Sequence, residues 1–179
     1  MPPLFCDTDL ARRIERAETK FITASTEAAQ RRTGGAGLLI PLTDGVEFGT
    51  WLEIVLDAVA HPDTEGLPWL EEFPRDVLEN AERDLAAAGA RHYLALVDRG
   101  PAGAASMGIE DGFAQFSAGT APAFRRRGVQ SALLAARVAD ATAAGCELAL
   151  VTVQPGSRSQ RNVQRRGFDL LYTRATLVR

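Results

Sequence analysis

The sequence has few of the residues that mark metal sites, disulfide frameworks or membrane spans. Only two cysteines occur in 179 residues, Cys6 and Cys146, far apart and without the short Cys/His spacing of a metal site. We therefore expect no metal and two reduced thiols, as in a cytoplasmic protein. No apolar run is long enough to cross a bilayer, and the first residues lack the basic region and apolar stretch of a signal peptide. We expect no membrane partner.

Charge is unevenly divided along the chain. Residues 121–179 hold ten arginines against three acidic residues, a local balance of +7, although the whole chain carries a net charge of −3. A basic half of this kind predicts an anionic partner, either nucleic acid or a phosphorylated cofactor, and charge alone does not choose between them. An apolar content of 46% in a chain of this length is ordinary for one globular domain.

The first ninety residues predict helices joined by irregular segments. Periodic apolar positions predict helices over residues 7–32, 49–60 and 76–88. In the last of these, Val77, Leu78 and Leu85 are expected to face inward. A short strand is expected at 38–40, and the prolines and glycine of 61–75 predict an irregular loop.

The second half has a sharper pattern. It predicts strands over 91–97, 102–109, 113–120, 147–153 and 168–178, with helices over 128–144 and 159–166. Asp111-Gly112 is expected to turn a hairpin. The strand at 147–153 is apolar on both faces, which favours a central, parallel position. The order predicts an α+β (mixed α/β) fold: a central mixed, mostly antiparallel sheet flanked by helices, with one parallel crossover.

A turn between a predicted strand and a predicted helix has the features of a phosphate site. It contains Arg125, Arg126, Arg127 and Gly128, directly before the apolar helix. The first N–H groups of a helix have no partner within it and lie at the positive end of its dipole, so they bind anions. A glycine lets the ligand approach the backbone, and arginines add charge and forked donors.

The same turn resembles motif A of the GNAT superfamily of N-acetyltransferases. Arg125-x-x-Gly128-x-Gln130 is similar to its Arg/Gln-x-x-Gly-x-Gly/Ala pattern, and Thr120-x-Pro122-x-Phe124 is similar to the lead-in common there. Residues 157–168, ending in Gly-Phe, resemble the short helix that closes such domains. The stretch 10–18 resembles the N-terminus of certain longer bacterial members, which implies a bacterial protein.

The resemblance implies a GNAT-like acyl-coenzyme A N-acyltransferase fold. Residues 91–179 would form the acetyl-coenzyme A binding core, and residues 1–90 a helical, variable part of the same domain on the acceptor side. The implied reaction moves an acetyl group from acetyl-coenzyme A, a cosubstrate, to a primary amine of a small molecule or protein. The residues implied in coenzyme binding are Ala118, Thr120, Arg125, Arg126, Arg127, Gly128, Val129, Gln130, Ser131 and Asn162.

The general acid is not supplied in the usual way. Many family members carry a tyrosine four residues before the glycine of Gly-Phe, and that position is Val163 here. The remaining proton donors are Tyr172, Ser159 and solvent. Packing on the sheet is the more ordinary role for an aromatic residue at position 172. Glu110 is a base candidate beside the hairpin, although turn chemistry alone also explains a carboxylate there.

Two further functions stay open. A non-catalytic acyl-coenzyme A binding or regulatory module would keep the phosphate turn and lack a proton donor, as Val163 allows. A nucleic-acid binder would use the basic half, but the net charge of −3 and the lack of aromatic residues between the arginines count against it. A homodimer is compatible with either reading.

Overall fold

The computed structural model describes residues 39–41, 45–63, 65–66, 73–98 and 100–173. A five-stranded sheet in the order β1-β2-β3-β4-β5 is its centre. The strands are β1 (Leu39–Pro41), β2 (Arg91–Val97), β3 (Gly100–Glu110), β4 (Phe113–Thr120) and β5 (Leu148–Val151). The helices are α2 (Gly45–Ala60), α3 (Arg75–Ala87), α4 (Val129–Ala143) and α5 (Arg158–Gln164). The predicted helix over 7–32 lies outside the described residues.

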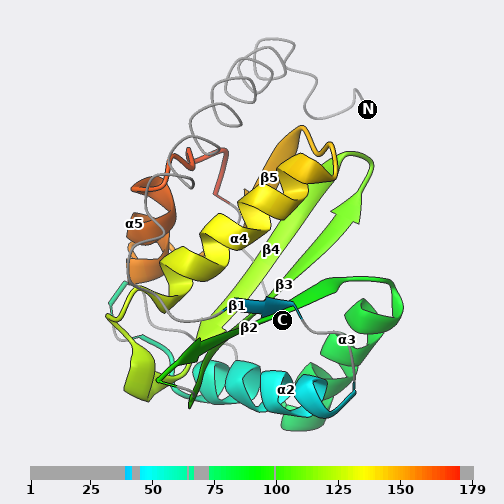
Figure 1. Ribbon diagram of the computed structural model, residues 1–179. Helices are drawn as coiled ribbons and strands as arrows, with labels where there is room; N and C mark the ends of the chain where they lie inside the picture. Colours follow the sequence, from blue (N-terminus) through cyan, green and yellow to red (C-terminus); the bar gives the residue numbers. More distant parts are fainter. Residues whose placement is uncertain (1–38, 42–44, 64, 67–72, 99, 174–179) are drawn as a thin grey trace, which may run out of the picture.

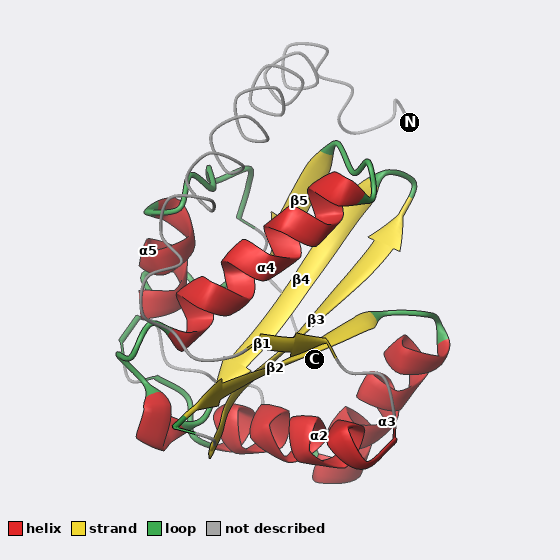
Figure 2. Ribbon diagram, in the orientation of Figure 1, coloured by secondary structure: helices red, strands yellow, loops and turns green. Residues whose placement is uncertain are grey.

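The sheet is mixed, as the sequence predicts. The pairs β1–β2, β2–β3 and β3–β4 are antiparallel. β5 runs parallel to β4 after the crossover through α4. Helix α4 covers one face of the sheet, and α2 with α3 lies on the opposite face (Figures 1 and 2). The α+β fold and the single parallel crossover are therefore confirmed.

Two hydrophobic cores hold these layers together. Leu133, Val138 and Phe116 belong to the core between α4 and the sheet, and Trp51 and Ile54 to the core beneath α2. The helices approach the strands closely because two strand positions are glycines. A Cβ on Gly103 would lie 2.4 Å from Val129 Cγ1, and a Cβ on Gly119 would lie 2.8 Å from Ala58 Cβ.

The hairpin between β3 and β4 forms where the sequence places it. Asp111 and Gly112 have φ angles of 48° and 80°, the two positive values that a tight two-residue hairpin turn requires. The pairs run from Glu110–Phe113 to Gly103–Thr120 without a shift in register.

Two expectations differ from the structure, and a third is met in part. β5 runs parallel to β4 as expected, but within the described sheet it pairs with β4 alone, and Leu150 is exposed. The described part of the expected last strand, residues 168–173, is not a strand. In α3, Val77 and Leu85 are each 48% exposed, because α3 packs against α2 instead of the sheet and buries only a narrow seam around Leu78.

Candidate active site

The turn before α4 leaves the first N–H groups of that helix uncapped. Gly128 occupies the N-cap position with φ 81° and makes no side-chain cap. A Cβ placed on Gly128 would meet nothing within 4 Å, so the space above its backbone is open. Arg126 also adopts a left-handed φ of 64°, which turns the chain sharply into the helix. An open, uncapped N-terminus of a 15-residue helix is suited to an anion.

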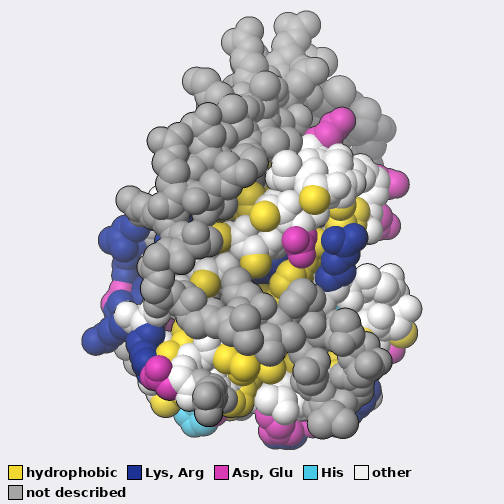
Figure 3. Space-filling view, in the orientation of Figure 1, with side chains coloured by type: hydrophobic (Ala, Val, Ile, Leu, Met, Phe, Trp, Pro, Cys, Tyr) yellow, Lys and Arg dark blue, Asp and Glu magenta, His cyan; other side chains and the backbone are white. Residues whose placement is uncertain are grey.

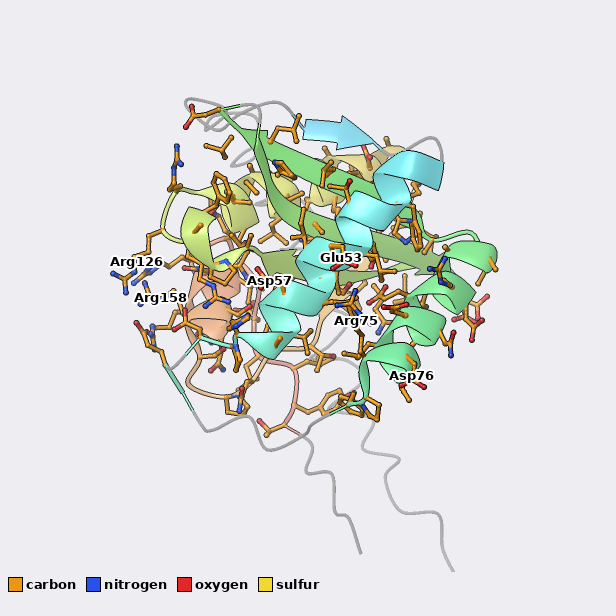
Figure 4. All side chains as sticks on the ribbon, turned by 90° about the horizontal axis from the view of Figure 1, so that it is seen from below. Glu53, Asp57, Arg75, Asp76, Arg126 and Arg158 are labelled. Atoms are coloured by element: carbon orange, nitrogen blue, oxygen red, sulfur yellow. The ribbon has the colours of Figure 1, made fainter. Side chains whose placement is uncertain are left out.

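The three arginines of the turn have different roles. Arg125 donates to the carbonyl oxygens of Thr120 and His61, so it braces the turn against the end of β4 and the end of α2. Arg127 donates to Asp98 at 2.7 Å and lies over the Phe124 ring. Arg126 is exposed and has no partner among the described residues (Figure 4). Of the three, Arg126 is the cation available to a ligand.

A hydrogen-bonded chain of side chains joins the first turn of α4 to α5. Asn162 Nδ2 donates to Gln130 Oε1 at 2.6 Å, and Gln130 Nε2 donates to Ser159 Oγ at 2.9 Å. The predicted residues Gln130, Ser159 and Asn162 are thus brought together. Val129 is buried in the core beside them, so its side chain faces away from solvent, and Ser131 is half-buried.

β4 loses its parallel partner halfway along its length. Pairing with β5 ends at Phe116–Val151, while pairing with β3 continues to Thr120 (Figure 1). The Ala121 N–H donates to the Ala102 carbonyl, which sets the phase of the β3–β4 ladder. Because ladder bonds alternate along an antiparallel strand, the N–H groups of Ala118 and Thr120 point away from β3, toward the side that β5 has left. The backbone at both predicted positions is therefore on the open edge.

A buried arginine, Arg137, lies under this open edge and was not singled out from the sequence. It is 2% exposed. Its Nη1 donates to Ser117 O at 2.7 Å and to Ser106 O at 3.4 Å, and its Nε donates to Leu133 O at 3.0 Å. The guanidinium lies 4.8 Å from the centre of the Phe116 ring, and burial lowers its pKa to about 10. The signal in the sequence is a single cation in a helix whose other buried positions are all apolar.

The segment that follows α2 is tied to α5. Asp63 forms an ion pair with Arg158, with 3.1 Å between Oδ2 and Nε, and Glu65 forms ion pairs with Arg158 and Arg161. The Gly66 backbone lies so close to α5 that a Cβ there would come within 2.8 Å of Ser157 N. Basic side chains gather on the side of the molecule that carries α5 (Figure 3), and several are neutralised by these acids.

The structure separates the three candidate catalytic residues. Ser159 lies near the turn before α4, because it accepts a hydrogen bond from Gln130 in the first turn of that helix. Glu110 is exposed at the hairpin, at the other end of β4, roughly 24 Å from Thr120 by the rise of a strand. Tyr172 is 69% exposed in the segment after α5 and is not part of a strand. Val163 is buried among the core residues around Phe168.

Neither histidine lies in this arrangement. His61 is exposed after α2 and bonds Asp57. His92 is buried on β2 with its ring perpendicular to the stacked rings of Phe48 and Trp51, and burial lowers its pKa. Within the described residues, no three His, Cys, Asp or Glu side chains form a group that could hold a metal ion. None of the helices described has the length and apolar content needed to cross a membrane.

Solved structures with this fold include several acetyltransferases. The aminoglycoside N-acetyltransferase AAC(6')-Iy, in complex with a bisubstrate analogue of coenzyme A, has a TM-score of 0.59 at 19% identity, over 79% of this chain and 96% of its own. The ribosomal-protein-alanine N-acetyltransferase from Brucella melitensis has a TM-score of 0.55 at 19% identity, over 72% and 81%. At such identities the likeness shows the fold alone.

Sequence comparison adds the family. No curated protein matches the chain. The model of the acetyltransferase (GNAT) family matches residues 56–168, which is more than half of the chain and extends from the end of α2 to the residue after Gly167. With the fold in agreement, the chain belongs to the acetyltransferase (GNAT) family.

Proposed function

We propose that this protein transfers an acetyl group from acetyl-coenzyme A to a primary amine. The observation that carries the proposal is the junction at the end of β4. There, an unpaired strand edge runs directly into a tight turn and an open helix N-terminus. An unpaired edge suits an amide-bearing arm such as pantetheine, and an open helix N-terminus suits a pyrophosphate.

The coenzyme would lie along these two features. The pantetheine amides would pair with the backbone of Ala118 and Thr120, as a short additional strand. The pyrophosphate would accept from the N–H groups of Gly128 to Ser131 and from the side chain of Arg126. Asn162, held by Gln130, would flank the arm from α5. Arg125 and Arg127 would support the turn from behind, because their own donors are engaged.

The chemistry requires one bond to form and another to break. The amine nitrogen attacks the thioester carbonyl carbon, and the carbonyl electrons move to oxygen, where the Ala118 N–H can stabilise the charge. Collapse breaks the C–S bond, the nitrogen loses a proton, and the coenzyme thiolate gains one. Ser159 accepts a hydrogen bond from Gln130, so its own proton remains available to the thiolate.

The acceptor that we propose is a primary amine, carried by either a small molecule or a protein. The similar structures include proteins described as acting on an aminoglycoside and on a ribosomal-protein alanine, which are acceptors of very different size. The α2 side of the sheet and residues 61–63, 65 and 66 would line the acceptor path. The basic half is a weak nucleic-acid surface, because Arg158, Arg161 and Arg127 are paired with acids.

Calorimetry and a thiol assay test this function together. Acetyl-coenzyme A should bind and should raise Tm, since a ligand at a hundredfold excess over its Kd adds about 2.7 kcal/mol to the free energy of unfolding. A panel of small amines and amino-terminal peptides should then release free coenzyme A thiol. Absence of binding at millimolar acetyl-coenzyme A would refute the proposal.

A non-catalytic acyl-coenzyme A binding module is the second candidate. It is favoured by two observations among the described residues. The burial of Val163 leaves Ser159 as the candidate donor that is hydrogen-bonded to the turn, and the candidate base Glu110 lies at the opposite end of β4. Tight binding of acetyl-coenzyme A without thiol release across the amine panel would select this reading over transfer.

A further inference from the structure

Arg137 occupies a position that packing alone does not explain. A cation removed from water costs free energy unless it is compensated, and a buried guanidinium keeps its proton at neutral pH. The side-chain bonds of Arg137 all go to carbonyl oxygens, those of Leu133, Ser106 and Ser117. Its shortest bond, 2.7 Å, is to Ser117 O in β4.

Ser117 O belongs to a particular peptide unit. The carbonyl of Ser117 and the N–H of Ala118 are the two ends of one planar trans peptide group, and they point in opposite directions. The carbonyl faces β3, in the row Ser106–Ser117 of the ladder. The Ala118 N–H faces the side from which β5 has departed, two residues beyond the last β4–β5 pair at Phe116.

A hydrogen bond from a cation to a peptide oxygen draws electron density toward that oxygen and makes the N–H of the same unit a stronger donor. The effect is largest in a buried site, where water does not screen the charge. Arg137 is fully enclosed by the sheet and α4, so its charge acts on this peptide at short range.

We propose that Arg137 is a positioning residue that polarises the Ser117–Ala118 peptide, so that the Ala118 N–H holds the oxyanion formed from the acetyl thioester. The inference rests on the proposed transferase function. Arg137 touches neither the coenzyme nor the acceptor and acts through the backbone of β4. The sheet thereby acquires an anion-stabilising N–H without an exposed cation in the reaction path.

Three variants separate this role from packing. Arg137→Met keeps the length of the side chain and removes both the charge and the donor. Arg137→Gln keeps a neutral donor, and Leu134→Met is the control for disturbance of the α4–sheet core, since Leu134 is buried on the same helix. If Arg137→Met does not fold, Arg137→Gln carries the same test.

The measurements are made on the full chain with acetyl-coenzyme A carrying ¹³C in its acetyl carbonyl. We expect the infrared C=O stretch of the bound thioester to lie below its value in solution for the wild type and to move back toward that value in the order Gln, then Met. The ¹⁵N and ¹H resonances of the Ala118 amide should shift in the ligand-free variants as well. Thiol release should fall by about tenfold in Arg137→Met, less than the loss of a whole oxyanion donor.

Two results overturn the inference and are distinguishable from each other. If the wild type binds no acetyl-coenzyme A, the proposed function fails and this inference fails with it. If acetyl-coenzyme A binds and the thioester stretch in both Arg137 variants equals that in wild type and Leu134→Met, only the role of Arg137 is refuted. Unchanged coenzyme Kd with a graded stretch and graded thiol release supports it.

Discussion

The two ends of β4 are built differently. At the hairpin end, β4 is paired on both sides, with β3 and with β5, and the connecting turn is closed by Asp111 and Gly112. At the other end, β4 pairs among the described residues with β3 alone and runs into the turn at Gly128. At the hairpin end, pairing on both sides engages the backbone of β4 in the sheet, so this end contributes to stability. Where the second partner is missing, backbone N–H groups are available to a ligand.

Substitution of Gly128 should reduce acetyl-coenzyme A binding more than substitution of Gly145, a matched glycine at the hairpin end. Gly128 and Gly145 have φ angles of 81° and 77°, and a Cβ on either meets nothing within 4 Å. Valine at each should cost a similar amount of stability, on the order of 1–3 kcal/mol for the strained backbone. Only Gly128→Val should abolish acetyl-coenzyme A binding by calorimetry, because its side chain occupies the phosphate space.

Gly145→Val is therefore the control for strain at the other end of α4. Equal loss of coenzyme binding in both variants would mean that the backbone strain, and not a phosphate at the turn, causes the defect. Unchanged affinity in Gly128→Val would place the pyrophosphate elsewhere.

Loss of the Ser159 hydroxyl, near the turn, should reduce turnover more than loss of the Glu110 carboxylate, at the hairpin. Ser159→Ala should reduce thiol release by about tenfold or more, since a positioned acid contributes at least that much. Glu110→Gln, at the hairpin, should leave turnover unchanged within about twofold. The coenzyme Kd, measured in parallel, should stay near the wild-type value for both.

Tyr172 completes this test. A drop in turnover of about tenfold in Tyr172→Phe at constant coenzyme affinity would assign the acid to Tyr172 and remove it from Ser159. If Ser159→Ala and Tyr172→Phe both keep full activity, water protonates the thiolate.

Within the turn itself, Arg126 and Arg127 should differ. Arg126→Gln removes the unpaired cation and should weaken acetyl-coenzyme A binding by about tenfold, the value of a hydrogen bond to a charged group. The difference should shrink at high salt. Arg127→Gln removes a side chain already paired with Asp98 and should change the Kd by less than about threefold. Titrations at two salt concentrations measure both effects, and equal losses would refute the distinction.

The smallest effect, on the pH dependence of stability, is expected at the middle of the sheet, between the two ends of β4. His92 is opposite Ser106 in the register, in the same row as Ser117. Burial lowers the pKa of His92 below its ordinary value, so the unfolded chain binds a proton that the folded chain does not. The free energy of unfolding should therefore be highest above the ordinary pKa of histidine and should fall as pH drops below it.

His92→Phe is the matched variant for this titration, because it keeps an aromatic ring against Phe48 and Trp51. Urea unfolding at pH 7.5 and pH 5 should show a smaller pH difference in His92→Phe than in the wild type. An identical difference in the two proteins would show that other groups cause the acid sensitivity.

Local chemistry explains which parts of the molecule could be read from the sequence. The Asp111-Gly112 hairpin and the Gly128 turn depend on backbone angles that few residues adopt, so their positions are marked by residue type. The strands and helices of residues 91–164 follow from apolar periodicity, which each segment carries in its own residues. The turn before α4 and the GNAT resemblance are readable for this reason.

Packing partners are a different matter. The apolar strand Leu148–Val151 looks central, but its place at the edge of the described sheet depends on which strand follows it in space. Val77 and Leu85 have helical spacing, but α3 packs on α2 alone and leaves them exposed. Glu110 is eight residues from Ala118 in sequence, yet it pairs with Phe113 at the opposite end of β4 from the turn.

Residue types and their spacing were thus sufficient for the elements between residues 91 and 164, for the position of the turn before α4 and for the family. Tertiary structure alone decided that β5 stops at Val151, that Gln130 meets Ser159 and Asn162, and that Arg137 lies beneath Ser117. The physical reason is the range of the interactions. Turn angles and periodicity are set by neighbours along the chain, whereas an unpaired strand edge and a buried cation exist only through contacts between segments distant in sequence.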